Sequence, residues 1–147
     1  MPVNWTLSDQ PGWQTLDVTG SDPSGLADAR MWAESKLTAL GDPHRLDALL
    51  IVGELLDNAY LHAGGPVELR LRRTSRPCEV TVAVADVGAG EPQLRVPTLD
   101  GGRGLRVVDQ LCLAWGVSHH DDGKLVWSRL RCAKSDEPCP QGWAGTN

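Results

Sequence analysis

Apolar residues recur at helical spacing in two stretches in the first half of the chain. Between about residues 26 and 40 they form a stripe among good helix formers, after a segment in which Asp22 or Ser24 could cap the helix. Between about residues 43 and 63 a second stripe falls on one side of a helix, which Gly64-Gly65-Pro66 ends. The sequence therefore predicts two consecutive helices.

Apolar and charged residues alternate further along the chain, which is typical of half-buried strands. Residues 67–73 and 79–85 show this alternation, and residues 72–77 form the predicted hairpin between them. A first strand, a third helix and two closing strands are predicted at residues 13–18, 105–113, 113–118 and 124–131.

The order of these elements predicts the fold class. Strand, helix, helix, strand, strand, helix, strand, strand is typical of an α+β fold, a two-layer α/β sandwich whose helices cover one face of a mixed, mostly antiparallel sheet. A chain of 147 residues has the size of one domain, which we place at residues 1–131. Residues 132–147 are polar and rich in Pro and Gly without a period, which predicts a flexible C-terminal tail.

The charge of the chain excludes some classes of partner. Fourteen Lys and Arg against nineteen Asp and Glu give a net charge of −5, so there is no general attraction to nucleic acid or anionic lipid. No apolar stretch reaches the roughly 20 residues of a membrane helix, and the N-terminus lacks the pattern of an export signal. We therefore expect a cytoplasmic protein without direct contact to nucleic acid or membrane.

The cysteines predict reduced thiols. Cys78, Cys112, Cys132 and Cys139 include no Cys-x-x-Cys pair. In a cytoplasmic chain this favours thiols over a disulfide framework and argues against structural zinc. The run His119-His120-Asp121-Asp122 could ligate a metal, but it lies in a predicted turn with no second cluster nearby in sequence, so we expect no metal there.

The second predicted helix carries an acid, an amide and an imidazole at four-residue steps. Glu54, Asn58 and His62 fall on one helical face, away from the apolar stripe. Apolar neighbours would partly desolvate the Glu54 carboxylate, which suits a general base. The amide oxygen of Asn58 could ligate Mg²⁺ without adding charge. The alternative is an ordinary solvated face.

Two glycine-rich segments follow regular elements. Asp86-Val-Gly88-Ala-Gly90 ends an apolar strand, and its glycines let the backbone approach a flat ligand. A carboxylate there could accept a hydrogen bond from the exocyclic amine of adenine, although a plain Asp-x-Gly turn is the alternative.

The second segment, Gly101-Gly102-Arg103-Gly104-Leu105, leads into a predicted helix whose free N–H groups could hold phosphate. Glycines before a helix are common, so this segment alone is weak evidence. The sequence contains no P-loop, and the Rossmann fingerprint fails because its third glycine is missing.

In this order, the three segments resemble the nucleotide site of the GHKL ATPase superfamily, which has the Bergerat fold. Within it, residues 24–131 are similar to the anti-sigma factor serine/threonine kinases of actinobacteria. The matching residues are Glu54-Leu55, Asn58-Ala59, His62-Ala63, Gly102-Arg103-Gly104-Leu105, Trp115-Gly116 and Gly123-Lys124-Leu125-Val126-Trp127.

The resemblance implies a site for ATP and Mg²⁺. Glu54 would be the base that prepares the acceptor hydroxyl or a water, Asn58 would hold Mg²⁺, and Asp86 would bind the adenine amine. The remaining nucleotide-binding residues implied are Gly88 and Gly90 in the base pocket, and Gly102, Arg103, Gly104 and Leu105 around the phosphates.

The resemblance also implies a function: a kinase that binds a sigma factor and phosphorylates an anti-sigma factor antagonist on Ser or Thr, with a homodimer allowed. Two positions depart from the family pattern. Asp57 replaces a small hydroxyl or apolar residue, and Leu125 replaces the hydroxyl residue often found beside the lysine. Two alternatives stay open: a non-catalytic nucleotide-binding regulatory module, and a histidine-kinase-like ATPase domain acting with a partner in trans.

Overall fold

The computed structural model describes residues 13–20, 25–62, 65–75, 78–87, 104–120, 123–132 and 139. The predicted order of strands and helices is confirmed. The elements are β1 (Trp13–Asp17), α1 (Leu26–Lys36), α2 (Asp42–His62), β2 (Pro66–Ser75), β3 (Cys78–Asp86), α3 (Gly104–Leu111), β4 (Ala114–His120) and β5 (Gly123–Arg131).

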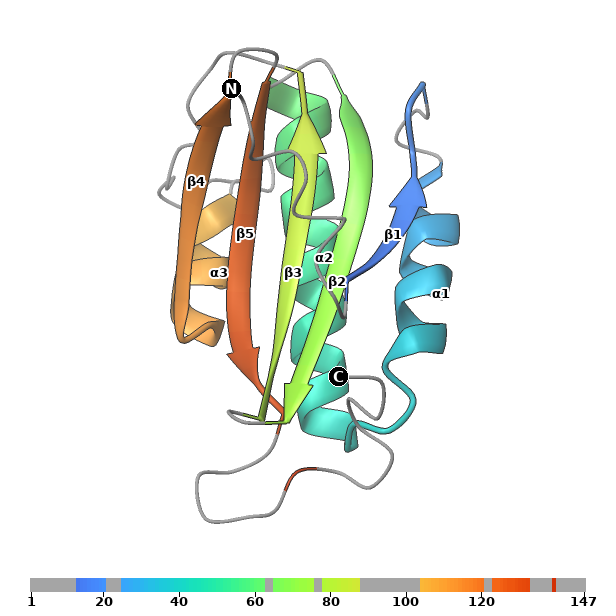
Figure 1. Ribbon diagram of the computed structural model, residues 1–147, viewed down its shortest axis with the longest axis vertical. Helices are drawn as coiled ribbons and strands as arrows, with labels where there is room; N and C mark the ends of the chain where they lie inside the picture. The colour runs from blue at the N-terminus through green and yellow to red at the C-terminus, as the bar shows by residue number, and fades with distance from the viewer. Residues whose placement is uncertain are drawn as a thin grey trace.

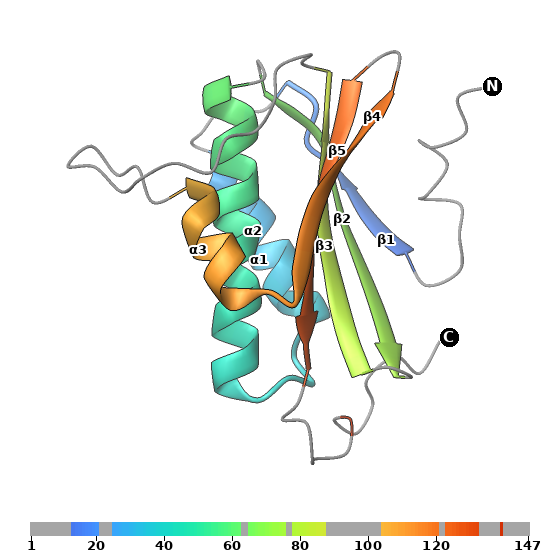
Figure 2. The same ribbon diagram turned by 90° about the vertical axis from the view of Figure 1, so that its left-hand side faces the viewer.

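The strands form one sheet in the order β1-β2-β3-β5-β4. Each of the four pairings between described strands is antiparallel. All three helices lie on one face of this sheet, which Figures 1 and 2 show from two directions. The predicted α+β sandwich is confirmed. β4 and β5 form the last hairpin. Its second strand, β5, lies beside the central strand β3, and β4 lies at the edge of the sheet.

The main core lies between the helices and the sheet. The apolar stripe of α2 is buried, and it meets the inward-facing residues of the central strands; the buried set includes Leu49, Val52, Leu56, Ala59, Val80, Val82, Val84 and Val126. Within the described residues, no helix is long and apolar enough to cross a membrane.

The end of α1 differs from the prediction. We expected a helix up to residue 40, but α1 ends at Lys36, because Leu37 leaves helical geometry with φ −115° and ψ 18°. Leu37 and Leu40 are nonetheless buried at 0% and 2% exposure. Their apolar spacing therefore reflects a buried turn, closed by a hydrogen bond from Leu40 N–H to the Leu37 carbonyl (3.0 Å), and not a further helical turn.

The glycine segment after α2 ends the helix as predicted. Gly65 has φ 115°, a backbone conformation that L side chains rarely adopt, and its N–H donates to the Ala59 carbonyl at 3.0 Å. The chain then enters β2 at Pro66.

The face of the sheet opposite the helices carries a smaller apolar cluster. Ala83, Ala85 and Leu125 are buried there against the side chains of Trp13 and Trp127. Trp127 also covers Gly116 on the neighbouring strand, where a Cβ atom would lie 2.7 Å from the ring. Trp32 and Trp115 pack against the main core, whereas Trp13 and Trp127 pack against this second cluster.

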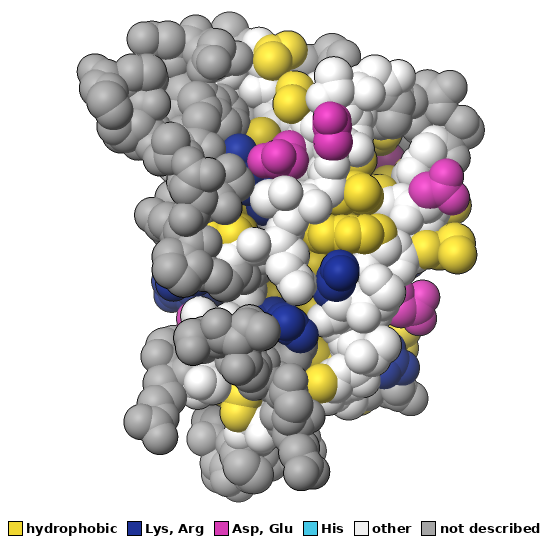
Figure 3. Space-filling model, turned by 45° about the vertical axis from the view of Figure 1, so that its right-hand side comes forward, with side chains coloured by type: hydrophobic (Ala, Val, Ile, Leu, Met, Phe, Trp, Pro, Cys, Tyr) yellow, Lys and Arg dark blue, Asp and Glu magenta, His cyan; other side chains and the backbone are white. Residues whose placement is uncertain are grey.

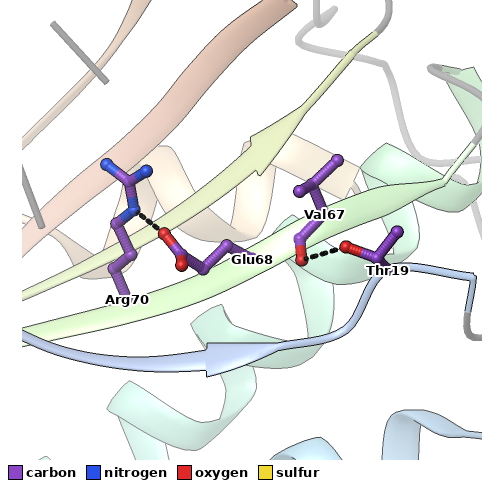
Figure 4. Close-up of polar contacts among 4 residues, drawn as sticks. All are labelled: Thr19, Val67, Glu68 and Arg70. Carbon is purple, nitrogen blue, oxygen red and sulfur yellow. Dashed lines mark hydrogen bonds and ion pairs between the residues drawn. The ribbon is translucent and has the colours of Figure 1, made fainter. Parts of the chain in front are cut away.

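Polar contacts fix the first strands. Thr19 Oγ1 donates to the Val67 carbonyl at 3.2 Å and so ties the end of β1 to β2, while Arg70 Nε contacts Glu68 Oε1 on the same strand (Figure 4). Figure 3 shows the side on which β1 and α1 lie, where apolar, basic and acidic side chains are interspersed.

The expectation of reduced cysteines is wrong for one pair. Cys78 and Cys139 form a disulfide with a Cα–Cα distance of 5.5 Å, within the usual range for such bonds. Cys112 and Cys132 are thiols. The fold brings Cys139 from the tail to the start of β3, which the spacing of cysteines along the chain does not reveal. The other residues beyond 132, and most of the predicted flexible tail, lie outside the described residues.

Candidate functional site

The face of α2 that carries Glu54 and Asn58 borders the core. Asn58 is 7% exposed and Glu54 is half-buried, while the adjacent Leu55 and Ala59 are buried in the main core. The two polar groups therefore lie one helical turn apart at the edge of the apolar interior. His62 is the last residue of α2, and its side chain lies outside the described residues.

Asp57, which departs from the family pattern, lies on the same helix and has a perturbed pKa. Burial raises the pKa of the Asp57 carboxyl, and the positive charge of Arg30 on α1 opposes this rise. This acid precedes Asn58 on α2 and lies beside, not within, the stripe of Glu54 and Asn58.

Asp86 is the last residue of β3 and is 1% exposed. Its position follows the alternation of Val80, Val82 and Val84, so its side chain lies on the sheet face that the helices cover. Oδ1 of Asp86 accepts from Nζ of Lys124 at 2.9 Å, and the Lys124 side chain is also 1% exposed. The predicted adenine acceptor is thus one half of a buried ion pair.

The backbone beside Asp86 needs a glycine on the next strand. Gly123 has φ 150°, and a Cβ atom there would lie 2.0 Å from the Asp86 carbonyl oxygen and 2.8 Å from Cα of Val87. Gly123 is also the first residue of β5, immediately before Lys124. The absence of a side chain at Gly123 is what lets β5 begin in contact with the end of β3.

Several predicted site residues lie outside the described part of the chain: Gly88, Gly90, Gly102 and Arg103. Gly104 is the first residue of α3, and Leu105 follows it in the helix, with a side chain that lies outside the described residues. The prediction that these residues bind nucleotide stays a prediction.

The elements that carry the predicted residues pack together. α2 contacts both β3 and α3. The C-terminal end of α2, the end of β3 and the start of β5 lie at the same end of the molecule in both ribbon views (Figures 1 and 2). A half-buried carboxylate, a buried amide and a buried, ion-paired carboxylate are therefore presented on packed elements. Oxygen atoms of this kind can ligate Mg²⁺ and can accept a hydrogen bond from an exocyclic amine.

A cavity of about 180 Å³ lies elsewhere, between the start of α2, the end of α3 and the end of β5, with His44 and Cys112 in its wall. None of the predicted nucleotide-binding residues lies in its wall. Within the residues that the structure describes, no group of three His, Cys, Asp or Glu side chains could hold a metal ion.

A family model described as histidine kinase-like ATPase domain matches residues 19–130, which is well over half of the chain. The chain belongs to this family. A search of curated proteins finds no match to the sequence. Membership as a histidine kinase-like ATPase domain supports an ATP-binding, regulatory ATPase or kinase-like function, and ATP binding in such domains usually involves Mg²⁺.

The sequence analysis of this ATPase domain did not predict the ion pair of Lys124 with Asp86. The signal was present, because Lys124 has the same alternation as Val126 and Leu130, which are buried at 2% and 3% exposure on the core side of β5. What the sequence lacked was the strand register, in which Lys124 pairs directly with Asp86.

Proposed function

We propose that the chain is an ATP-dependent protein serine/threonine kinase that binds a sigma factor and phosphorylates an antagonist protein on Ser or Thr. The observation that carries the proposal is the half-buried Glu54 one helical turn before the buried Asn58. A carboxylate that is partly removed from water is suited to accept a proton, and the neighbouring amide oxygen can ligate a cation without adding charge.

Each residue has a separate task in this proposal. Glu54 accepts the proton of the acceptor hydroxyl while the hydroxyl oxygen attacks the γ-phosphorus, the bond from that phosphorus to the β,γ-bridging oxygen of ATP breaks, and ADP leaves. Asn58 would hold Mg²⁺ through its amide oxygen, and the bound ion would neutralise charge on the phosphates. Asp86 accepts from the adenine amine, because a carboxylate has about four lone-pair sites and can bind this donor together with the Lys124 ammonium.

The test separates turnover from binding. We expect Glu54→Gln to lower phosphate transfer from radiolabelled Mg-ATP to the antagonist by about 100-fold or more, because general base catalysis contributes this much. The affinity for ATP, measured by calorimetric titration, should change by only about threefold, because Glu54 acts on the acceptor hydroxyl and does not contact the adenine. The matched control is Glu34→Gln, which changes an exposed acid on α1.

The antagonist is found by mass spectrometry of phosphosites after incubation of native extract with the wild-type protein or with Glu54→Gln. Phosphoserine or phosphothreonine that depends on Glu54 supports the kinase. Tight ATP binding without such transfer contradicts the kinase and favours a regulatory nucleotide-binding module. If the wild-type protein does not bind ATP, the nucleotide site itself is wrong.

A further inference from the structure

The ion pair between Lys124 and Asp86 is buried on both sides. The distance from Lys124 Nζ to Asp86 Oδ1 is 2.9 Å, and each side chain is 1% exposed. Lysine is rarely buried in proteins, and a buried charge is costly unless it is paired. A hydrophobic pair at these positions would often be at least as stable. Stability alone therefore gives no reason for an ion pair at this place.

The geometry holds the pair in one arrangement. Lys124 is the direct cross-strand partner of Asp86, and on the other side of β3 Asp86 pairs with Pro66 of β2. Gly123 allows this approach of β5, because any Cβ atom there would collide with the Asp86 carbonyl oxygen. Lys124 and Asp86 thus both lie on paired strands.

The chemical consequence concerns hydrogen bonding. An ionised carboxylate only accepts hydrogen bonds, whereas a protonated carboxyl can also donate one. A carboxylate that stays charged can accept from the amine at position 6 of a purine, but it opposes the carbonyl oxygen that a 6-oxo purine carries there. A site with buried polar groups discriminates strongly when one partner is left unpaired.

We propose that Lys124 is a positioning residue for base recognition, whose ammonium keeps the Asp86 carboxylate charged and fixed so that the site accepts a 6-amino purine and rejects a 6-oxo purine. This inference rests on the proposed nucleotide site and names the residue that sets its base specificity. Lys124 acts through Asp86 and does not itself need to contact the base.

Titratable groups also lie on the elements that pack against this pair. His119 of β4 is the cross-strand partner of Lys124, and α2 carries Glu54 on the helix that packs against β3. β2 contributes the uncharged Pro66 opposite Asp86. Lys124 is the cation that contacts the carboxylate, at 2.9 Å, so its removal is a direct way to change the hydrogen-bonding state of Asp86.

The experiment compares ATP with ITP, whose base differs at position 6 and in the proton on the adjacent nitrogen. Calorimetric titration of both nucleotides is carried out with the wild-type protein, Lys124→Met and Lys124→Arg between pH 6 and pH 9. We expect the wild-type protein to prefer ATP by about 100-fold or more. Lys124→Met should reduce this ratio by at least about tenfold at pH 7, because a buried carboxyl without a cation takes up a proton.

The pH profile separates positioning from a general structural role. In Lys124→Met the preference for ATP should return as the pH rises and the carboxyl ionises again, while Lys124→Arg should keep the wild-type ratio at every pH. Lys36→Met on α1 is the matched control for a lysine replacement and should leave the ratio unchanged.

Three outcomes would overturn the inference while leaving ATP binding intact: a wild-type protein that binds ITP as tightly as ATP, a Lys124→Met protein that keeps the wild-type ratio, or a lowered ratio that does not respond to pH. If Lys124→Met does not fold, the same titrations with ATP and ITP are made on the double variant Lys124→Met/Asp86→Asn, in which both charged side chains are replaced by neutral ones. An amide both donates and accepts, so this variant should lose the preference, and retention of the preference overturns the inference. Failure of the wild-type protein to bind either nucleotide instead overturns the proposed function.

Discussion

Asp57 and Asp86 are aspartates at the border of one core, and their partners give them different properties. Asp86 has a buried lysine at 2.9 Å, which compensates its charge. The positive charge of Arg30 lowers the pKa of Asp57, but burial is the larger effect, so the pKa of Asp57 is raised. A raised pKa means that the folded state binds a proton more tightly than the unfolded chain, so stability is lost as the pH rises through the folded-state pKa.

Asp57→Asn should therefore stabilise the protein at pH 7 and make little difference near pH 3. The pH window begins at about 3.8, the ordinary pKa of the group, and extends upward to the raised value. Because the side chain is partly exposed, we expect a gain on the order of a few tenths of a kcal/mol. Urea denaturation at both pH values measures it, with Asp28→Asn on α1 as the matched change of charge. A loss of stability at pH 7 would mean that attraction to Arg30 is the larger effect.

At the scale of elements, Gly123 at the start of β5 determines how closely β5 approaches the end of β3. Gly123 is the first residue of β5; it precedes Lys124 and lies against the backbone of Asp86. Two separate causes exclude a side chain there: the φ of 150° and the distance of 2.0 Å to the Asp86 carbonyl oxygen.

Gly123→Ala should destabilise the protein by about 3 kcal/mol or more, because both backbone strain and a collision with main-chain atoms arise. It should also weaken ATP binding, since the end of β3 must shift. Thermal unfolding and calorimetric titration measure the two effects. Gly41→Ala is the matched control, because a Cβ atom at Gly41 meets nothing within 4 Å. A Gly123→Ala protein with wild-type stability would contradict the close approach of β5.

The sequence predicts elements better than it predicts their contacts. Alternation at residues 79–85 and the stripe on α2 reveal β3 and α2 because burial on one face leaves a period in the chain. The spacing of Leu37 and Leu40 wrongly predicted a helix up to residue 40, because a buried turn can carry the same apolar spacing as a helix. The register between β3 and β5 leaves no such period, so the pairing of Asp86 with Lys124 emerges only from the structure.

At the scale of the whole molecule, the cysteines gather at the end opposite the predicted nucleotide site. Cys78 begins β3, whereas Asp86 ends it, and all four cysteines belong to or pack against the main core. Cys132 N–H donates to the Cys78 carbonyl at 3.2 Å, which places the end of β5 beside the disulfide. The number of cysteines in the sequence could not predict this arrangement, because connectivity depends on the fold.

Cys139→Ser should lower the free energy of unfolding by about 2–4 kcal/mol, because the disulfide closes a loop across a sequence separation of 61 residues and so restricts the unfolded chain. ATP affinity should stay within about twofold, since the bond lies at the far end of β3. Urea denaturation and nucleotide titration measure these effects. Cys112→Ser, which removes a half-buried thiol outside the disulfide, is the control. Equal stability of Cys139→Ser and the oxidised wild-type protein would contradict a stabilising bond.

The disulfide also changes the covalent connectivity of the protein. Cys78 and Cys139 enclose β3, α3, β4 and β5 in one ring, and with them the connection from residue 88 to residue 103 that bears most of the glycines expected around ATP. A protease that cuts this ring once produces no separate fragments, because the two pieces remain joined through sulfur. The cleaved chain therefore migrates as one species until a reductant is added, when it divides in two.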